Sequence, residues 1–188
     1  MTFLALVRHG ETDWNLHGRL QGSSDIPLNA TGRAQAREAV YELEDHPWEV
    51  LVSSPLSRAA ETADIIGEHL GISRTATYPD LVERHFGAAE GFTDYDAYSH
   101  WPHGRYPGLE PRREMIVRGV RAVDELAASH PTASVIAVAH GGIIRGILEA
   151  LRGVPSPRIL NAGVSTLVHD GSEWTVKTIN GVPTRRLW

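Results

Sequence analysis

Three short apolar segments of this chain each end abruptly at polar residues, and this pattern limits the fold more than any other feature. Residues 3–8 and 134–139 are nearly continuous apolar runs, and residues 49–53 have the same strand character. Such runs are typical of strands buried on both faces of a parallel sheet. Between and after them, apolar residues recur at helical spacing. The sequence therefore predicts a three-layer α/β/α fold with one mainly parallel sheet.

The expected helices begin at recognisable signals. Asn29 and Thr31 are alternative caps of a helix that runs to about Asp45, and a second helix follows Pro55. Helical periodicity returns at residues 116–127, and a further helix is expected directly after the apolar run that ends at residue 139. The tail predicts a hairpin that turns at an Asp-Gly pair.

Residues 90–113 interrupt this periodicity. They are rich in aromatic residues, histidine, glycine and proline, and a long irregular stretch inside a compact domain is usually a lid or a binding loop. We expect a substrate loop here, within a single domain that spans residues 1–188. Four of its residues either contact the substrate or pack on the surface: Trp101, His103, Arg105 and Tyr106.

Composition argues against several classes of function. The chain has 18 Lys+Arg against 23 Asp+Glu, a formal net charge of -5, which gives no support for nucleic-acid binding. It has no cysteine, which excludes disulfides and thiolate chemistry. The apolar runs are too short to cross a bilayer, and no basic region precedes the first one as in a signal peptide. We expect a cytoplasmic protein without nucleic-acid or membrane partners.

Basic residues and histidines stand where the expected strands end. Arg8 and His9 close the first strand, Arg58 begins the helix after the second, and His140 closes the third. Because the carboxyl ends of parallel strands lie at the same edge of a sheet, we expect these side chains to meet. Guanidinium groups hold phosphate oxygens, and helix N-termini add N–H donors. The sequence therefore predicts a site for a phosphorylated ligand.

Four motifs in this order resemble those of the histidine phosphatase superfamily, which includes phosphoglycerate mutase-like enzymes. They are the run over residues 4–15 around Arg-His-Gly, residues 53–62, the acidic motif over residues 81–91, and the His-Gly-Gly that begins at residue 140. Each motif is weak alone, but the four in the expected order are specific.

The resemblance implies that His9 is a nucleophile that attacks phosphorus. Arg8 and Arg58 match phosphate-binding arginines of the family, and His140 matches its second phosphate-binding histidine. His9 must attack as a neutral base, and a hydrogen bond from its other nitrogen, for example to a backbone carbonyl, would fix the tautomer. Arg8, Arg58 and a charged His140 would stabilise the negative charge of the transition state.

Glu83 matches the family's proton donor. It has to be protonated to give a proton to the leaving alkoxide, and burial beside bound phosphate favours that neutral form. After phosphohistidine forms, ionised Glu83 can activate water, and such acid–base assistance is worth about 10²–10⁴-fold. Glu90 is close enough in sequence to be the alternative acid.

Five further residues are expected at the substrate: Asn15, Thr12, Gln21, Gly22 and Gly141. Asn15 matches a residue that contacts the phosphoryl group, and Gln21 and Gly22 lie where the family's substrate loop runs. Thr12 flanks the nucleophile or is only a local cap, and the residues from Gln21 onward could form an ordinary polar turn. No cofactor and no metal are expected, because the histidines near Glu83 fit no standard metal motif.

Three functions are open at this point. The leading hypothesis is a phosphomonoester hydrolase that acts through phosphohistidine on a small phosphorylated metabolite. The first alternative is a cofactor-dependent phosphoglycerate mutase, and the second is a non-catalytic protein that binds a phosphorylated ligand. The family's mutases carry a longer basic insertion after the acid motif, whereas residues 92–113 are short and carry few cations, which favours hydrolysis. Residues 14–15 and 83–87 nevertheless resemble the mutase versions. A homodimer is left open.

Overall fold

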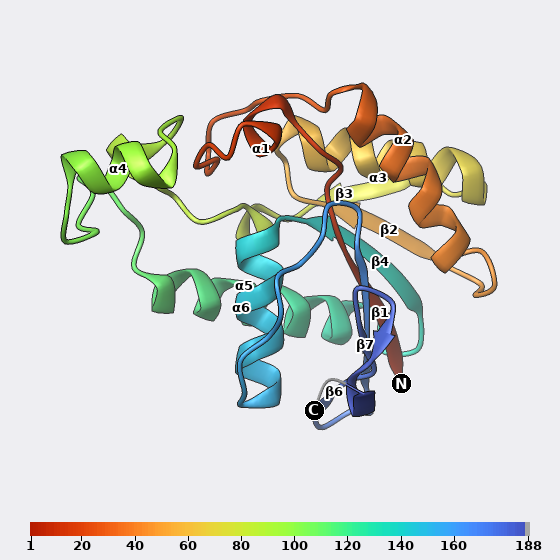
Figure 1. The fold of residues 1–188 in the computed structure, drawn as a ribbon. Coiled ribbons are helices and arrows are strands. Elements are labelled where there is room, and N and C mark those ends of the chain that lie inside the picture. Colours follow the sequence, from red (N-terminus) through yellow and green to blue (C-terminus); the bar gives the residue numbers. More distant parts are fainter. Residues whose placement is uncertain (187–188) are drawn as a thin grey trace.

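A six-stranded sheet forms the centre of the molecule (Figure 1). The computed structural model describes residues 1–186. The strand order is β3-β2-β4-β1-β5-β6. The strands are β1 (Thr2–Arg8), β2 (Val50–Ser53), β3 (Arg74–Thr77), β4 (Ser134–Ala139), β5 (Val164–His169) and β6 (Trp174–Val176). The first four run parallel, and β5 pairs antiparallel with both β1 and β6. The predicted, mainly parallel sheet is confirmed.

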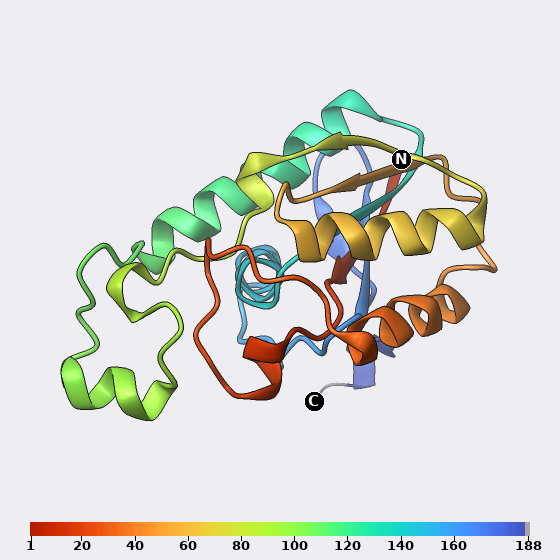
Figure 2. The same ribbon diagram turned by 90° about the horizontal axis from the view of Figure 1, so that it is seen from above.

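Two pairs of helices cover the two faces of the sheet (Figures 1 and 2). On one face α2 packs against α3, and on the other α5 packs against α6. Their bounds are α2 (Ala30–Glu38), α3 (Ser57–Leu70), α5 (Arg112–Ser129) and α6 (Gly141–Arg152). Side chains of β1 alternate between the faces, since Leu4 and Leu6 join the core under α5 and α6 whereas Ala5 and Val7 join the other. The three-layer architecture follows from this alternation.

The helix expected to reach Asp45 is shorter. Asn29 caps it, because its side chain accepts a hydrogen bond from the Gly32 amide at 2.8 Å. After α2 the chain continues as a 3₁₀ turn, η1 (Ala39–Glu42). The three-residue spacing of this turn buries both Val40 and Leu43.

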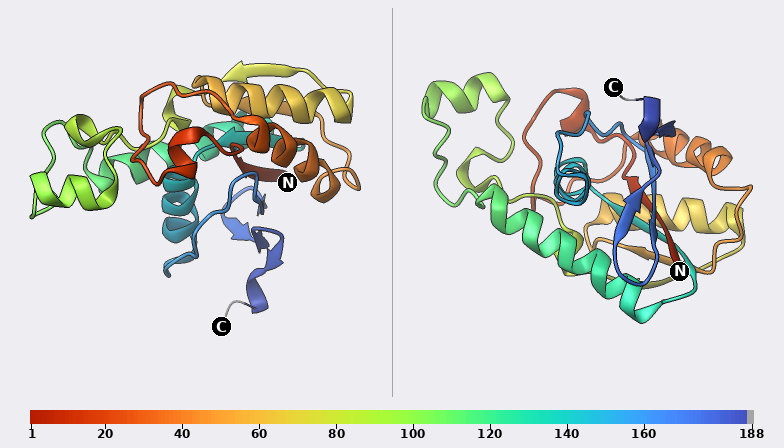
Figure 3. Two further views of the ribbon diagram at one scale, coloured as in Figure 1. Left: turned by 45° about the horizontal axis from the view of Figure 1, so that its top comes forward. Right: turned by 90° about the horizontal axis from the view of Figure 1, so that it is seen from below.

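The expectation that residues 90–113 are irregular is wrong for the seven residues of α4 (Asp94–His100), and residues 112–113 already belong to α5. The Thr93 hydroxyl caps this helix by accepting a hydrogen bond from the Asp96 amide at 3.1 Å. Only Ala97 of α4 is buried, so no apolar stripe marks the helix in the sequence. Figures 2 and 3 show that this segment extends away from the sheet, beyond the end of α5.

The remaining elements are short. They are α1 (Asp13–Leu16), β7 (Thr178–Ile179), β8 (Val182–Pro183) and the 3₁₀ turns η2 (Pro79–Leu81), η3 (Gly87–Ala89) and η4 (Thr184–Arg186). The predicted tail hairpin is confirmed as β5 and β6. The edge strand β3 was not predicted, because three of its four residues are exposed and carry no apolar pattern. Within residues 1–186, every helix is too short or too polar to cross a membrane.

Candidate active site

The ends of β1 and β4 place two histidines side by side. The strands pair in parallel register, with Arg8 opposite Ala139. The His9 amide donates a hydrogen bond to the Ala139 carbonyl at 3.0 Å. His140 follows directly, and its ring centroid lies 5.1 Å from that of His9 in an edge-to-face arrangement. The sheet therefore brings together two of the residues expected to meet at its edge.

The imidazole of His9 is held in one tautomer. It is buried, and its Nδ1 lies 2.6 Å from the Gly10 carbonyl oxygen. A carbonyl can only accept, so the proton is on Nδ1 and Nε2 keeps its lone pair. Burial, together with the guanidinium groups of Arg8 and Arg58, lowers the pKa of His9 well below its ordinary value. His9 is neutral, as a nucleophile requires.

His140 is fully buried beside the end of β2. Its Nε2 lies 2.8 Å from the Ser54 hydroxyl. Burial and the nearby Arg58 guanidinium lower the pKa of His140 well below its ordinary value. The expected charge on His140 is therefore absent in the free protein, because an imidazolium would be desolvated next to other cations. Within residues 1–186, its Nδ1 makes no hydrogen bond.

Arg8 and Arg58 are buried cations that backbone carbonyls hold in place. Nη1 of Arg8 donates to Ile159 at 2.8 Å, and Arg58 donates to Ser24 at 2.9 Å and Gly22 at 2.7 Å. Burial lowers the pKa of each arginine to about 10, so both remain charged at neutral pH. In the described part of the chain, Nε of each makes no hydrogen bond. Gly22, expected at the substrate, therefore acts here as a support for Arg58.

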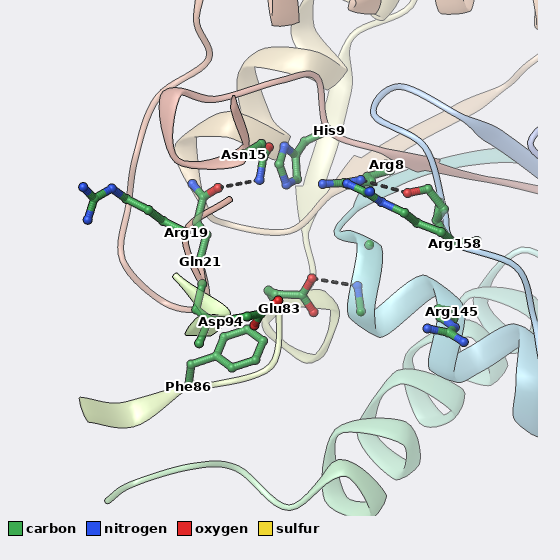
Figure 4. Close-up of a pocket in the computed structure, with 14 residues that line it drawn as sticks. Arg8, His9, Asn15, Arg19, Gln21, Glu83, Phe86, Asp94, Arg145 and Arg158 are labelled. Carbon is green, nitrogen blue, oxygen red and sulfur yellow. Dashed lines mark hydrogen bonds between the residues drawn. The ribbon is translucent and has the colours of Figure 1, made fainter. Parts of the chain in front are cut away.

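Glu83 lies against the first turn of α6. Its Oε2 accepts a hydrogen bond from the Gly142 amide at 2.7 Å, and its Oε1 accepts one from Ile143 at 3.0 Å. A Cβ at position 142 would come within 2.5 Å of Oε1, so glycine permits this approach. The carboxylate thus uses helix N-terminal donors that were expected to bind phosphate. Figure 4 shows Glu83 in the same pocket as His9.

Thr12, Asn15 and Gln21 form a hydrogen-bonded group next to His9 (Figure 4). Oε1 of Gln21 accepts hydrogen bonds from the Thr12 hydroxyl at 2.7 Å and from Asn15 Nδ2 at 3.1 Å. This leaves the buried Nε2 of Gln21 without a partner among residues 1–186. Thr12 is fully buried and caps α1, so it positions the other two side chains.

These side chains surround a pocket with a volume of about 430 Å³, which is enough for a small metabolite. Six of the expected site residues line it: Arg8, His9, Asn15, Gln21, Glu83 and Gly141. The other four are buried outside its lining: Thr12, Gly22, Arg58 and His140.

Seven further residues with side chains line the pocket and were not predicted from the sequence: Arg19, Leu20, Phe86, Asp94, Arg145, Arg158 and Ile159. Phe86 belongs to the acidic motif, so its nearness to Glu83 in the sequence could have indicated it. Arg145 is four residues after Gly141 on α6, so helical spacing could have indicated it. Asp94 is the first residue of α4, which has no apolar stripe in the sequence, and Arg158 lies in the connection between α6 and β5, whose path the sequence does not reveal.

Glu90, the alternative acid, supports a loop. Its carboxylate accepts hydrogen bonds from the amides of Ser23 at 2.9 Å and Ser24 at 2.7 Å, and from both hydroxyls. Burial alone would raise the pKa of Glu90, but these hydrogen bonds lower it below its ordinary value. Glu90 does not line the pocket, so the geometry favours Glu83 as the acid.

The four aromatic and basic residues considered for a substrate-reading role, residues 101, 103, 105 and 106, do not line the pocket. Trp101 instead packs against Phe92 and Tyr106, each with ring centroids 5.6 Å apart. Of the two roles considered for these residues, the structure therefore supports packing on the surface and not contact with the substrate. In residues 1–186, no three His, Cys, Asp or Glu side chains are grouped so that they could hold a metal ion.

Comparison with known proteins gives the family. The family model described as the histidine phosphatase superfamily (branch 1) matches residues 4–181. The chain belongs to this superfamily. The resemblance seen in the sequence motifs is confirmed.

Several relatives of this histidine phosphatase match over nearly its whole length. Uncharacterized phosphatase PhoE of Bacillus subtilis is 39% identical over 184 residues, which cover 96% of this chain and 95% of PhoE. A metal-independent phosphoserine phosphatase of Arabidopsis thaliana is 32% identical over 197 residues, which cover 97% of this chain and 82% of the Arabidopsis protein. The structure of a mycobacterial glucosyl-3-phosphoglycerate phosphatase with VO3 superposes with a TM-score of 0.85 at 31% identity, covering 95% of this chain and 98% of that one. Proteins named phosphoglycerate mutases also match.

Proposed function

We propose that this histidine phosphatase hydrolyses a small phosphorylated metabolite through a phosphohistidine on His9. One observation carries the proposal: four buried nitrogens near His9 make no hydrogen bond within residues 1–186. They are Nε of Arg8, Nε of Arg58, Nδ1 of His140 and Nε2 of Gln21. Buried polar groups are almost always hydrogen-bonded. Donors of this kind around a nucleophile fit the acceptor oxygens and negative charge of a phosphoryl group.

In the first step, Nε2 of His9 attacks phosphorus. A P–N bond forms while the P–O bond to the alcohol breaks. Arg8 and Arg58 stabilise the charge on the phosphoryl oxygens in the transition state. Protonated Glu83 gives its proton to the leaving alkoxide and becomes a carboxylate, which the amide of Gly142 stabilises at 2.7 Å.

In the second step, water attacks phosphorus and the P–N bond breaks. Ionised Glu83 accepts the proton of the water, so inorganic phosphate is released and both Glu83 and His9 return to their starting forms. One carboxyl group therefore acts first as acid and then as base. Its place on the wall of the His9 pocket supports this double role.

His140 acts as a hydrogen-bond donor to the phosphoryl group. In the tautomer that is protonated on Nδ1, its Nε2 accepts a hydrogen bond from the Ser54 hydroxyl, 2.8 Å away. The Nδ1–H, which has no hydrogen-bond partner within residues 1–186, is then available to a phosphoryl oxygen. Bound phosphate favours the imidazolium by its negative charge, so a charged His140 is expected only in the complex.

Hydrolysis is favoured over the mutase reaction by the residues around the pocket. A mutase has to keep water away from the phosphohistidine, and in this family a basic insertion serves that purpose. Here residues 92–113 contribute Asp94 to the pocket, whereas none of the arginines of this segment lines it. The pocket therefore has no counterpart of the basic insertion that keeps water out in the mutases.

The proposal needs no metal, because Arg8, Arg58 and His140 meet the charge of the transferring phosphoryl group. The Arabidopsis relative named as metal-independent supports this. A cytoplasmic location and a homodimer stay predictions from the sequence.

Trapping of the phosphoenzyme tests the proposal. The protein is incubated with a panel of labelled phosphomonoesters, and interconversion of 2- and 3-phosphoglycerate is followed in parallel. We expect phosphate release and acid-labile label on the protein, both lost in His9→Ala and retained in His69→Ala, which changes an exposed histidine on α3. Acid-labile label on the His9→Ala protein would overturn the role of His9. Interconversion faster than phosphate release would assign a mutase, and tight binding of phosphorylated ligands without turnover would assign a binding protein.

A further inference from the structure

The pocket carries more positive charge than one phosphoryl group uses. Four arginines line it, against two acidic residues, although the whole chain has a net charge of -5. These are Arg8, Arg19, Arg145 and Arg158, with Glu83 and Asp94. Arg8 belongs to the phosphoryl site, and the other three arginines are not used by the proposed reaction. Figure 4 shows Arg158 beside Arg8, and Arg145 on the same side of the pocket, whereas Arg19 lies on the opposite side.

Arg158 is the cation of this group that has no anionic partner and lies beside the reaction site. Within residues 1–186, its exposed side chain forms neither a hydrogen bond nor an ion pair. Burial contributes most to the lowered pKa of Arg8, and the charge of Arg158 lowers it further. Two like charges at such a position repel each other, and an anion bound near both would relieve this repulsion.

The backbone at Arg158 is fixed although the side chain is free. Its carbonyl accepts a hydrogen bond from Asn180 Nδ2 at 2.9 Å. The next residue, Ile159, is buried, and its carbonyl accepts the hydrogen bond from Nη1 of Arg8 at 2.8 Å. Pro157 restricts the chain on the other side. The same segment therefore anchors Arg8 and presents Arg158 to the pocket.

Arg145 is a weaker second cation on this side. Its Nε donates to Glu149 at 3.1 Å and to the Ser156 carbonyl at 3.0 Å. Glu149 also pairs with Arg112, so the charge of Arg145 is only partly neutralised. Arg145 therefore reinforces the positive potential around Arg158.

We infer that Arg158, reinforced by Arg145, binds a second anionic group of the substrate. The inference rests on the proposed function and names its substrate class: a small phosphomonoester that also carries a carboxylate or a second phosphate. Such a group lies away from the reacting bond, so it is bound equally in the ground state and the transition state, and its loss raises KM more than it lowers kcat.

Matched substrates test this role. 3-Phosphoglycerate is compared with glycerol 3-phosphate, which has a hydroxymethyl group in place of the carboxylate, and fructose 1,6-bisphosphate with fructose 6-phosphate. In Arg158→Gln we expect kcat/KM to fall at least about tenfold for the substrate of each pair that carries the additional carboxylate or phosphate, mainly through KM. The kcat/KM for the other substrate should change little.

Arg158→Lys should retain part of the preference for the substrate with the additional anionic group. Arg37→Gln, an exposed arginine on α2, is the control for net charge and should leave both members unchanged. The pair with the larger effect identifies a carboxylate or a phosphate.

Binding measurements make the test independent of turnover. Calorimetry compares 4-phosphonobutyrate with propylphosphonate, which lacks the carboxylate and cannot be hydrolysed either. We expect the wild type to prefer 4-phosphonobutyrate and Arg158→Gln to lose that preference. Equal losses for both ligands, no loss for either, or the same selective loss in Arg19→Gln would overturn the assignment. Failure of the proposed function is a different result, because preferential binding would then persist without any phosphohistidine.

Discussion

The imidazole rings of His9 and His140 lie edge to face, 5.1 Å apart, because each follows one of two neighbouring parallel strands. Both rings are buried near two guanidinium groups, and the pKa of each is well below its ordinary value. The folded protein therefore holds two neutral histidines that would both take up protons in the unfolded chain below a pH of about 6.5.

This relationship predicts acid-sensitive stability. Below that pH the unfolded state binds protons that the folded state does not, so the free energy of unfolding falls as the pH falls. For each histidine the loss between about pH 7.5 and 5.5 amounts to about 1.4 kcal/mol. Urea denaturation measures it. In His9→Gln the fall over the same interval should be smaller by about that amount, whereas the exposed His69→Gln should match the wild type. Identical falls in all three proteins would show that His9 is not neutral in the fold.

Replacement of Glu83 by glutamine separates the two chemical steps. Glu83→Gln keeps the size of the side chain but cannot deliver a proton, so an alkyl phosphate should react about 10²–10⁴-fold more slowly. An aryl phosphate needs less help for its leaving group, and its phosphohistidine should accumulate because the second step lacks a base. Rapid-quench kinetics follows both substrates. Equal losses without any phosphoenzyme would remove Glu83 from the acid role. Urea denaturation of Glu83→Gln shows whether the altered hydrogen bonds to the start of α6 destabilise the fold, which would be a separate cause of slower turnover.

Arg118 on α5 is expected to be a positioning residue for Glu83. Its guanidinium donates hydrogen bonds to the carbonyls of Val82 at 2.6 Å and Glu83 at 3.0 Å, and pairs with Glu110 at 2.8 Å. Lysine cannot reproduce this planar set of contacts. In Arg118→Lys we therefore expect kcat for an alkyl phosphate to fall about tenfold or more, with a smaller loss for an aryl phosphate.

Arg121→Lys is the matched control for this prediction. Arg121 lies on the same helix and contacts Asp80, but it is exposed and does not touch the Glu83 segment. It should retain normal kinetics with both substrates. If Arg118→Lys slows alkyl and aryl phosphates to the same extent, Arg118 serves folding alone.

Chelation tests the charge balance of the site. Arg8 and Arg58 stay charged at neutral pH, with a pKa of about 10 each, and together with His140 they meet the charge of the phosphoryl group. We expect turnover to be unchanged after treatment with EDTA. Loss of activity that a divalent cation restores would mean that a metal supplies charge which this scheme assigns to the arginines.

The sequence was most informative where a residue's neighbours along the chain decide its environment. The apolar run of β4 and the amphipathic spacing of α3 predicted both elements, because burial imposes a period on each. α4 and β3 escaped notice since neither has a buried face that shapes its composition. Local pattern therefore revealed the core elements and missed the exposed ones.

The same reasoning explains which parts of the candidate site were found. His9 and His140 end strands, so topology alone predicted that they meet. The charge of His140 in the free protein was predicted wrongly, because it depends on burial next to Arg58, which no spacing reports. Arg158 was missed because its position depends on the path of a long connection, and Asp94 was missed because it begins α4, a helix without a buried apolar face.

The reversed direction of β5 explains how Arg158 reaches the catalytic edge. In a sheet whose strands all run the same way, the chain re-enters each strand at the edge opposite the site. β5 instead begins with Val164 paired to Val7, next to the catalytic edge where β1 ends. The eleven residues between α6 and β5 must therefore return across this edge, and on the way they supply the Ile159 carbonyl to Arg8. One inverted strand thus gives the enzyme an extra wall, and the same connection ties that wall to the nucleophile, because Asn161 Nδ2 and the Ala162 amide each donate a hydrogen bond to the His9 carbonyl at 3.2 Å.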